Sequence, residues 1–410
     1  MKKPLLAGAA MAGMMTTPVF AQSSVTLYGL IDQGVNYVSN VQTGRSGAGA
    51  LQGQHQIALS DGATGIGGSR WGLKGSEDLG GGLRAIFTLE NGFNINTGGL
   101  AQGGLLFGRQ AFVGLANPYG QLTFGRQYSI VSDMLAPLSQ AGEIPGHMGA
   151  NPDDLDDLGH SIRINNSIKF RSTSYGGFVF GAMYSLGGVA GATGRNQLWA
   201  LSGTYANGPL SAGVGYLNAR NPNLSYFGTN GNSGGDTVNN MGSAGSATAG
   251  QTNTLYAGFA SARSMQLAVA GAKYKFGAAT IGATVSHLSF DDLGDATSGP
   301  NPLHYSGTAV FNNGEVNATW AFTSAFSVNA AYSYTRKASV GQYGSATYHQ
   351  GELSAAYFLS KRTELYALAI YQQASGTDSL GQSAVASITQ LTASSTNKQA
   401  LVRLGILHLF

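Results

Sequence analysis

Apolar and polar positions alternate with a period of two along most of this chain, whereas helical periodicity is nearly absent. Residues 315–322 read EVNATWAF and residues 325–335 read AFSVNAAYSYT. In the first stretch the apolar face carries Val316, Ala318, Trp320 and Phe322, and the opposite face carries Glu315, Asn317 and Thr319. Side chains of an extended strand point alternately to opposite faces, so this pattern predicts strands with one wet and one apolar face.

Two further segments show what each face carries. In residues 163–171 (RINNSIKFR) one face has Arg163, Asn165, Ser167, Lys169 and Arg171, and the other has Ile164, Ile168 and Phe170. The last ten residues, LVRLGILHLF, place Val402, Leu404, Ile406, His408 and Phe410 on one face. In a soluble protein such a terminal strand invites aggregation, whereas a lipid-facing last strand needs this surface.

The connections between these segments alternate strictly between short and long. Short turns are predicted at 79–82, 117–120, 174–177, 206–209, 275–278, 322–325 and 359–362, and longer polar or glycine-rich stretches are centred near residues 55, 100, 145, 191, 240, 300, 344 and 386. Seven turns and eight loops separate sixteen strands. All turns then lie at one end of the sheet and all loops at the other.

This organisation predicts an all-β fold, a sixteen-stranded antiparallel transmembrane barrel. Hydrocarbon cannot hydrogen-bond exposed peptide groups, so a sheet that spans a membrane must close on itself. A barrel of about sixteen strands leaves a water-filled channel, and its inward polar faces contact water.

Composition agrees and excludes several function classes. The chain has 62 glycines, 37 tyrosines and phenylalanines (19 + 18), 10% charged residues and no cysteine. Such a composition favours sheet over helix, and without cysteine there are neither disulfides nor thiolate metal sites. The near-balanced charge gives no sign of nucleic-acid binding. The seven histidines lack zinc-site spacing, so we expect neither a metal nor a cofactor.

The N-terminus predicts export. Lys2 and Lys3 precede an apolar run that ends near Met15, and small residues lead to Ala21, which is typical of a signal peptide over residues 1–21. The mature chain is then residues 22–410, with 20 basic (22 − 2) and 19 acidic side chains. No mature segment approaches the about 18 consecutive apolar residues that a membrane helix needs.

Four aspartates crowd into residues 153–157, within the third long connection (about 129–162). Asn151 is a good N-cap, Pro152 suits the first helical position and Gly159 can end a helix, so a two-turn helix is predicted. Such a helix would set three acids along one face at i, i+3 and i+4. The candidate loop acids are Asp153, Asp154, Asp156 and Asp157, with Glu143 as an alternative from the same loop.

Several stretches resemble the general diffusion porins of Gram-negative bacteria, most of all the porins of beta-proteobacteria such as Burkholderia and Bordetella. They are residues 23–37, 69–94 and 107–129 and the terminal Phe410. The resemblance implies a sixteen-stranded barrel in the outer membrane, a homotrimer, and a third loop folded inward as a constriction. The residues that match the family's basic wall are Arg70, Lys74, Arg126, Arg163 and Arg171, and Arg109 is a further candidate.

These features predict passive diffusion of small hydrophilic solutes and ions, with carboxylates facing guanidinium groups across a narrow aqueous space. The cations predict a modest anion preference, and outer-membrane lipid or lipopolysaccharide is an expected partner. A channel specific for sugars or organic anions is the first alternative. An adhesin or an enzyme is the second, because residues 231–235 (GNSGG) match a nucleophile-elbow pattern around Ser233, although without the required strand and helix.

Overall fold

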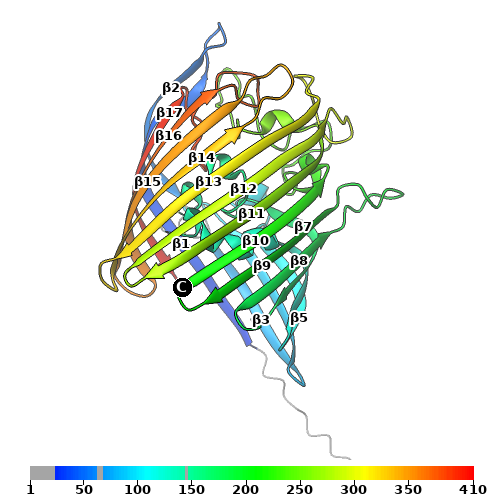
Figure 1. Cartoon of the computed structure of the whole chain (residues 1–410), viewed down its shortest axis with the longest axis vertical. Coiled ribbons are helices and arrows are strands. Elements are labelled where there is room, and N and C mark those ends of the chain that lie inside the picture. The colour runs from blue at the N-terminus through cyan, green and yellow to red at the C-terminus, as the bar shows by residue number, and fades with distance from the viewer. Residues whose placement is uncertain (1–23, 62–67, 144–145) are drawn as a thin grey trace, which may run out of the picture.

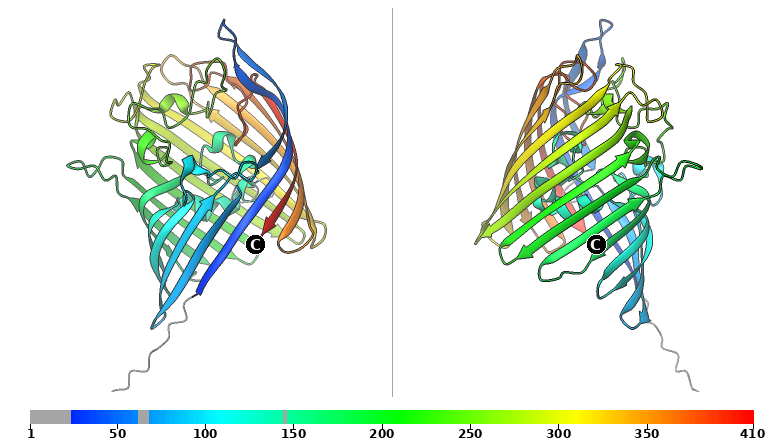
Figure 2. Two further views of the ribbon diagram at one scale, coloured as in Figure 1. Left: turned by 180° about the vertical axis from the view of Figure 1, so that it is seen from behind. Right: turned by 45° about the vertical axis from the view of Figure 1, so that its right-hand side comes forward.

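The computed structural model describes residues 24–61, 68–143 and 146–410, and the predicted signal peptide lies outside them. These residues form a tilted antiparallel barrel with loops gathered at one end (Figures 1 and 2). The strands are β1 (Ser24–Arg45), β2 (Leu51–Asp61), β3 (Arg70–Gly80), β4 (Leu83–Gly92), β5 (Gln110–Asn117), β6 (Gly120–Tyr128), β7 (Arg163–Ser172), β8 (Phe178–Ser185), β9 (Leu198–Asn207), β10 (Leu210–Arg220), β11 (Ala262–Phe276), β12 (Ala279–Leu293), β13 (Gly307–Ala321), β14 (Phe326–Lys337), β15 (Ala346–Phe358), β16 (Thr363–Gly376) and β17 (Lys398–Leu409).

Helical segments are few and short among the described residues. They are α1 (Ile130–Leu135) and α2 (Pro222–Ser225), with single 3₁₀ turns η1 (Gln102–Gly104), η2 (Ala136–Leu138), η3 (Gln140–Gly142), η4 (Gly146–Gly149), η5 (Pro152–Asp154) and η6 (Ala257–Phe259). Within the described part of the chain, no helix has the length and apolar character needed to cross a bilayer.

The predicted sixteen-stranded closed barrel is confirmed. The structure has seventeen strands, but β2 and β3 both pair with the same edge of β1 and together occupy one of the sixteen positions around the barrel. One edge of β1 pairs with β17 and closes the barrel. The other edge pairs with β3 over residues 24–30 and with β2 over residues 33–45. All seven predicted turns fall between paired strands, but the loop predicted near residue 55 is wrong. That segment is β2, which forms a hairpin with the 22-residue β1.

The predicted alternation is visible in the exposure of the side chains. On β13, Val316 and Trp320 are exposed, whereas Glu315 and Asn317 are buried inside the barrel. On β17, Val402, Leu404 and Ile406 are exposed in the same way. The apolar faces therefore point outward, as a lipid-facing surface requires.

One predicted lipid-facing residue is placed wrongly by simple parity. Asn166 has a left-handed backbone (φ 52°), and the pairing of β6 with β7 shifts register between Gly125 and Gln127. An extra residue in a strand breaks the alternation of facing at that point. Ile164 is consequently fully buried within an apolar cluster inside the barrel, whereas Phe170, beyond the bulge, stays exposed.

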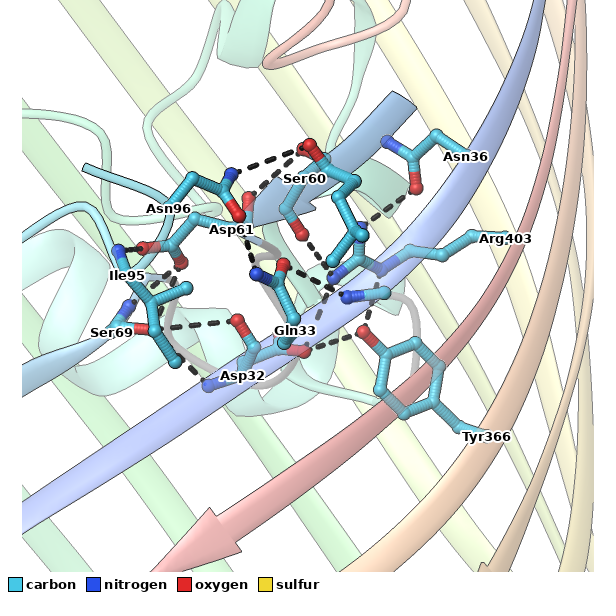
Figure 3. A network of polar contacts seen from close by, with 12 residues as sticks. Asp32, Gln33, Asn36, Ser60, Asp61, Ser69, Ile95, Asn96, Tyr366 and Arg403 are labelled. Atoms are coloured by element: carbon cyan, nitrogen blue, oxygen red, sulfur yellow. Dashed lines mark hydrogen bonds and ion pairs between the residues drawn. The ribbon is translucent and has the colours of Figure 1, made fainter. Parts of the chain in front are cut away.

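The seam between the first and last strands carries a buried polar network (Figure 3). Arg403 on β17 donates to Asp32 on β1 at 3.3 Å, to Asn36 at 2.7 Å and to the hydroxyl of Tyr366 on β16 at 2.6 Å. Tyr366 in turn donates to Asp32 at 2.6 Å. Below this network, the peptide groups of Phe410 and Gly29 exchange two hydrogen bonds of 3.0 and 3.1 Å. Side chains and main chain thus both fasten the closing pair of strands.

We expect Arg403→Met to lower the free energy of unfolding by about 3–5 kcal/mol, because it leaves the buried Asp32 carboxylate without its cation. The midpoint of heat-induced loss of β-structure, followed by circular dichroism, measures this loss. The double variant Arg403→Met with Asp32→Leu removes both charges and should lose less. Equal midpoints for wild type and Arg403→Met would show that the network does not hold the seam.

Candidate functional site

The described residues of segment 129–162, which are 129–143 and 146–162, fold into the barrel because α1 is apolar on the side that meets the wall. Ser129 caps α1 by accepting a hydrogen bond from the Val131 amide at 3.1 Å. The α1 side chains of Ile130, Val131, Met134 and Leu135 are buried in a cluster with wall residues such as Met183, Leu198 and Leu217. Complete burial of one such side chain contributes about 1.5–3 kcal/mol, so this patch is a strong anchor for the segment.

Two wall glycines make room for α1. A Cβ atom at Gly181 would lie 2.4 Å from Ile130, and a Cβ atom at Gly215 would lie 3.0 Å from Cγ1 of Val131. A side chain at either position would push the helix away from the wall. The close approach of α1 to β8 and β10 therefore depends on these glycines.

Beyond α1, the segment is tied to the wall by polar contacts. The Gln140 amide donates to Oε1 of Glu315 on β13 at 2.6 Å. Lys273 on β11 forms an ion pair with Glu143 and donates to the Ser139 carbonyl at 3.4 Å. The structure therefore places Glu143, a predicted loop acid, in contact with a wall cation.

The predicted two-turn helix in the aspartate stretch is wrong. The structure has the single turn η5 there, and Asn151 does not cap it. Asp153, Asp154 and Asp157 have left-handed backbones with φ of 54°, 48° and 57°. Aspartate tolerates this conformation better than most residues, and its carboxylate accepts hydrogen bonds from nearby backbone amides in place of missing helical partners. The acid cluster supports an irregular loop, and its members do not share a helical face.

Two of the aspartates satisfy the backbone of their own loop. Asp154 accepts hydrogen bonds from the amides of Gly159 at 2.7 Å and Ser161 at 3.0 Å, and its carboxylate lies 3.6 Å from Nε2 of His147. Asp157 accepts from the Ile162 amide at 2.9 Å and from the hydroxyl of Ser132 in α1 at 2.5 Å. These contacts fix the loop internally.

The other two aspartates bind the loop to its surroundings. Asp156 accepts from Ser286 on β12 at 2.7 Å. Asp153 accepts from the Ser387 hydroxyl at 2.5 Å and from the Leu255 amide at 3.2 Å. Ser387 and Leu255 belong to the β16–β17 and β10–β11 connections, so these two connections also pack on segment 129–162.

Burial changes the proton affinity of this loop. The pKa of Asp153 and that of Asp156 rise to about 6, and the pKa of Asp157 is also raised, because burial disfavours the charged carboxylate. Burial lowers the pKa of His160 to about 4 and lowers that of His147. Burial therefore favours the neutral forms of Asp153, Asp156, Asp157, His147 and His160.

Three of the predicted basic-wall residues gather around Tyr128 and Glu90. Arg109 pairs with Glu90 at 2.9 Å and donates to the Tyr128 hydroxyl at 2.6 Å. Arg163 donates to the same hydroxyl at 3.2 Å and lies over the Tyr128 ring at 4.9 Å. Arg70 lies 4.0 Å from Glu90. The structure thus brings Arg70, Arg109 and Arg163 together on β3, β5 and β7.

The other predicted basic residues lie apart from this group. Arg126 donates to the Thr229 carbonyl at 2.6 Å and so holds the β10–β11 connection inside the barrel. Lys74 is exposed, with its ammonium group 5.3 Å from the ring centre of Tyr28. Arg171 is exposed near the turn end of β7. The six predicted cations therefore do not form one cluster, and three of them lie elsewhere along the wall.

Sequence reasoning missed several charged and polar members of this site. Glu90 pairs with Gly72 across β3 and β4, and Gly72 lies midway between Arg70 and Lys74. The register of these two strands is therefore the feature that could have identified Glu90 as a member of the site. Lys169 forms an ion pair with Asp133 of α1 at 2.6 Å. The alternation of residues 163–171 placed Lys169 on the polar face of its strand, but no local pattern indicated that Asp133 would be its partner.

A polar cavity of about 410 Å³ remains between the basic group and the loops. Arg109, Arg163 and His147 contribute its titratable side chains together with Asp61. Its polar lining is completed by Ser69, Asn94, Gln102, Ser161, Asn230, Asn232 and Gln390. Among the residues described, no group of three or more histidine, aspartate or glutamate side chains could hold a metal ion.

Comparison with known proteins agrees with the closed barrel. The Gram-negative porin family model matches residues 7–377. The chain belongs to the Gram-negative porin family. An outer membrane porin of Bordetella pertussis is 39% identical over 240 residues, covering 54% of this chain and 61% of the relative. Outer membrane porin protein 32 of Delftia acidovorans is 36% identical over 228 residues, covering 52% and 59%.

Solved structures share the fold of this porin. An anion-selective porin from Comamonas acidovorans superposes with a TM-score of 0.67 at 22% identity, covering 95% of this chain and all of that one. OmpT of Vibrio cholerae gives a TM-score of 0.64 at 14% identity. The chain spans about three fifths of the length of the Bordetella and Delftia porins that it matches. Family membership and the closed barrel place the protein in the outer membrane as a multi-pass β-barrel.

We expect the anchored loop of wild-type porin to become less stable as the pH rises from about 4 to about 6, relative to Asp156→Asn. A carboxyl group whose pKa rises on folding binds its proton more tightly in the folded protein, so that stabilisation is lost when it ionises. Hydrogen–deuterium exchange of residues 130–160, corrected for intrinsic rates, measures the difference. Asp236→Asn, on an outer loop, is the control. Parallel pH profiles for wild type and Asp156→Asn would contradict the assignment.

Proposed function

We propose that this porin forms a water-filled channel through which small hydrophilic solutes and ions diffuse passively across the outer membrane. This proposal rests on the polar cavity beside Arg109 and Arg163, which stays open where segment 129–162 crosses the barrel interior. The segment narrows the lumen, and the cavity's polar lining suits hydrated solutes. In this proposal the channel has no enzymatic turnover and needs no cofactor.

The charge around the cavity favours anions. Arg70 and Arg109 pair with Glu90, and Arg163 lies beside them over the Tyr128 ring. These three guanidinium groups outnumber the two carboxylates of this site, Glu90 and Asp61. Arginine keeps its charge in such a partly desolvated place and binds anions through a planar fork of donors. A ring of one charge sign sets channel selectivity. The selectivity stated for the Comamonas protein of the same fold supports this proposal.

The acids of segment 129–162 have a different task in this proposal. Hydrogen bonds hold Asp153, Asp154, Asp156 and Asp157 to the loop and its neighbours, and Glu143 pairs with Lys273. They shape the constriction by fixing the loop in place. The basic wall of Arg70, Lys74, Arg109, Arg126, Arg163 and Arg171 then dominates the field that a passing solute meets.

Aromatic side chains argue against a dedicated sugar channel. A sugar path needs accessible rings in a row, but Phe259, Phe290 and Phe311 are fully buried between loops and wall. Many other rings, such as Trp320 and Phe322, face outward. We propose that the assembled form is a homotrimer surrounded by outer-membrane lipid, as the porin fold suggests.

We expect wild-type porin in a planar bilayer to show a reversal potential of the anion-selective sign in a salt gradient. Arg163→Ala and Arg109→Ala should each shift that potential toward cation selectivity, because each removes positive charge from the cavity lining. Arg362→Ala, which removes the same charge from an exposed turn, is the control and should leave the potential unchanged. Strong cation selectivity of the wild type would overturn the proposed preference.

A further inference from the structure

Three connections meet around a second polar cavity inside the barrel. They are the β6–β7, β10–β11 and β16–β17 connections, and the cavity has a volume of about 270 Å³. It shares Ser161, Asn230 and Gln390 with the cavity of about 410 Å³ beside Arg109 and Arg163. The two cavities therefore adjoin at these three shared residues.

The two cavities differ in charge. Asp153 and Asp154 line the second one, which we call the acidic cavity, and no arginine or lysine among the described residues does so. The hydrogen bonds to Asp153 come from a hydroxyl group and a backbone amide, which are neutral and do not cancel its charge. The carboxylate of Asp154 lies 3.6 Å from Nε2 of His147, which lines the cavity of Arg109 and Arg163, called here the basic cavity. Negative and positive surroundings thus lie side by side.

Aromatic rings make the acidic cavity suitable for an ammonium group. Phe227 is half-buried, and it borders the cavity together with Tyr256. The centres of the two rings lie 5.2 Å apart. The face of an aromatic ring carries partial negative charge and attracts a cation that comes within about 6 Å of its centre. Rings and carboxylates therefore act in the same direction and favour an organic cation.

Gln390 stands where the two cavities join. Its backbone is left-handed (φ 70°), which is uncommon for glutamine, and strained residues of this kind are concentrated at ligand sites. Its side chain is exposed, and its amide forms no hydrogen bond with the rest of the described chain. A side-chain amide both donates and accepts hydrogen bonds, so it matches the N–H and C=O groups of a peptide bond.

We propose that the two cavities together bind a short peptide as a zwitterion, with its ammonium group in the acidic cavity, its carboxylate in the basic cavity and a peptide group beside Gln390. The carboxylate half of this inference rests on the proposed function, because it uses the same basic cavity. A single α-amino acid carries both charges on one carbon and does not reach both cavities. Each further residue of an extended peptide separates the charges by about 3.3–3.6 Å.

Isothermal titration calorimetry of the full mature porin in detergent, at about pH 7, tests this proposal with three probes. Triglycine carries both charges, N-acetyl-triglycine has only the carboxylate, and triglycinamide has only the ammonium group. We expect triglycine to bind at least about tenfold more tightly than either other probe, since each of these lacks one charge-assisted contact. Equal affinities of triglycine and N-acetyl-triglycine would overturn the ammonium site, and equal affinities of triglycine and triglycinamide would overturn the carboxylate site.

Two variants locate the ammonium group. Asp153→Asn removes the charge but keeps an acceptor for the Leu255 amide, and it should weaken triglycine binding about tenfold without changing N-acetyl-triglycine binding. Phe227→Leu should weaken triglycine binding about two- to fivefold, again with no change for the acetylated probe. Asp236→Asn removes the same charge from a residue that lines neither cavity, and this control should bind both probes like wild type.

The variants can also contradict the proposal. Unchanged triglycine binding in Asp153→Asn and Phe227→Leu would overturn the acidic cavity as the site. Equal losses for triglycine and N-acetyl-triglycine in both variants would overturn it as well, because the loss would then not depend on the ammonium group. Calorimetry requires no ion conduction, so peptide binding and the proposed channel selectivity, measured by reversal potential, can fail independently.

Discussion

The structure depends on one constraint, the need of every backbone amide and carbonyl in the hydrocarbon zone for a partner. A sheet meets this need only when its first and last strands pair, as β1 and β17 do over residues 30–38 and 401–409. Closure also decides where side chains go. Apolar residues at alternate positions face lipid, and their neighbours are turned to a lumen that is too wide for the wall alone to fill. Arg403 and Asp32 secure the pair of strands on which closure rests.

The lumen is narrowed by connections that carry their own apolar and polar anchors. Part of the inner wall is apolar, and α1 covers it with Ile130, Val131 and Leu135. Farther along the segment, carboxylates replace the regular hydrogen bonding that an irregular loop lacks. What stays open is the polar space beside Arg109 and Arg163. The channel's character thus follows from which wall residues the loops leave uncovered.

Much of the fold could be predicted from the sequence because period-two alternation and turn residues act locally. The strand count, the turns and the outward face of β13 needed no long-range information. Two wrong predictions, the outward facing of Ile164 and the helix after Asn151, come from residues with left-handed backbones, which a pattern of apolar and polar positions does not reveal. The bulge at Asn166 moved Ile164 inside, and left-handed aspartates replaced the helix expected after Asn151. The partners of the site, such as Glu90 with Arg109 and Lys169 with Asp133, depend on register and on the path of a loop, which no local pattern encodes.

The described part of segment 129–162 is fixed inside the barrel against β8–β11 by α1 and its polar contacts. A disulfide between Val131→Cys and Gly215→Cys tests it directly, in a chain without natural cysteines. Cγ1 of Val131 lies 3.0 Å from the Cβ position at Gly215, so the two Cβ atoms fall within the about 4.5 Å that a disulfide spans. We expect mild oxidation to cross-link the folded barrel nearly completely and to leave the single-channel conductance as it is in the reduced protein. Failure to cross-link, or a cross-link that changes the conductance, would contradict it.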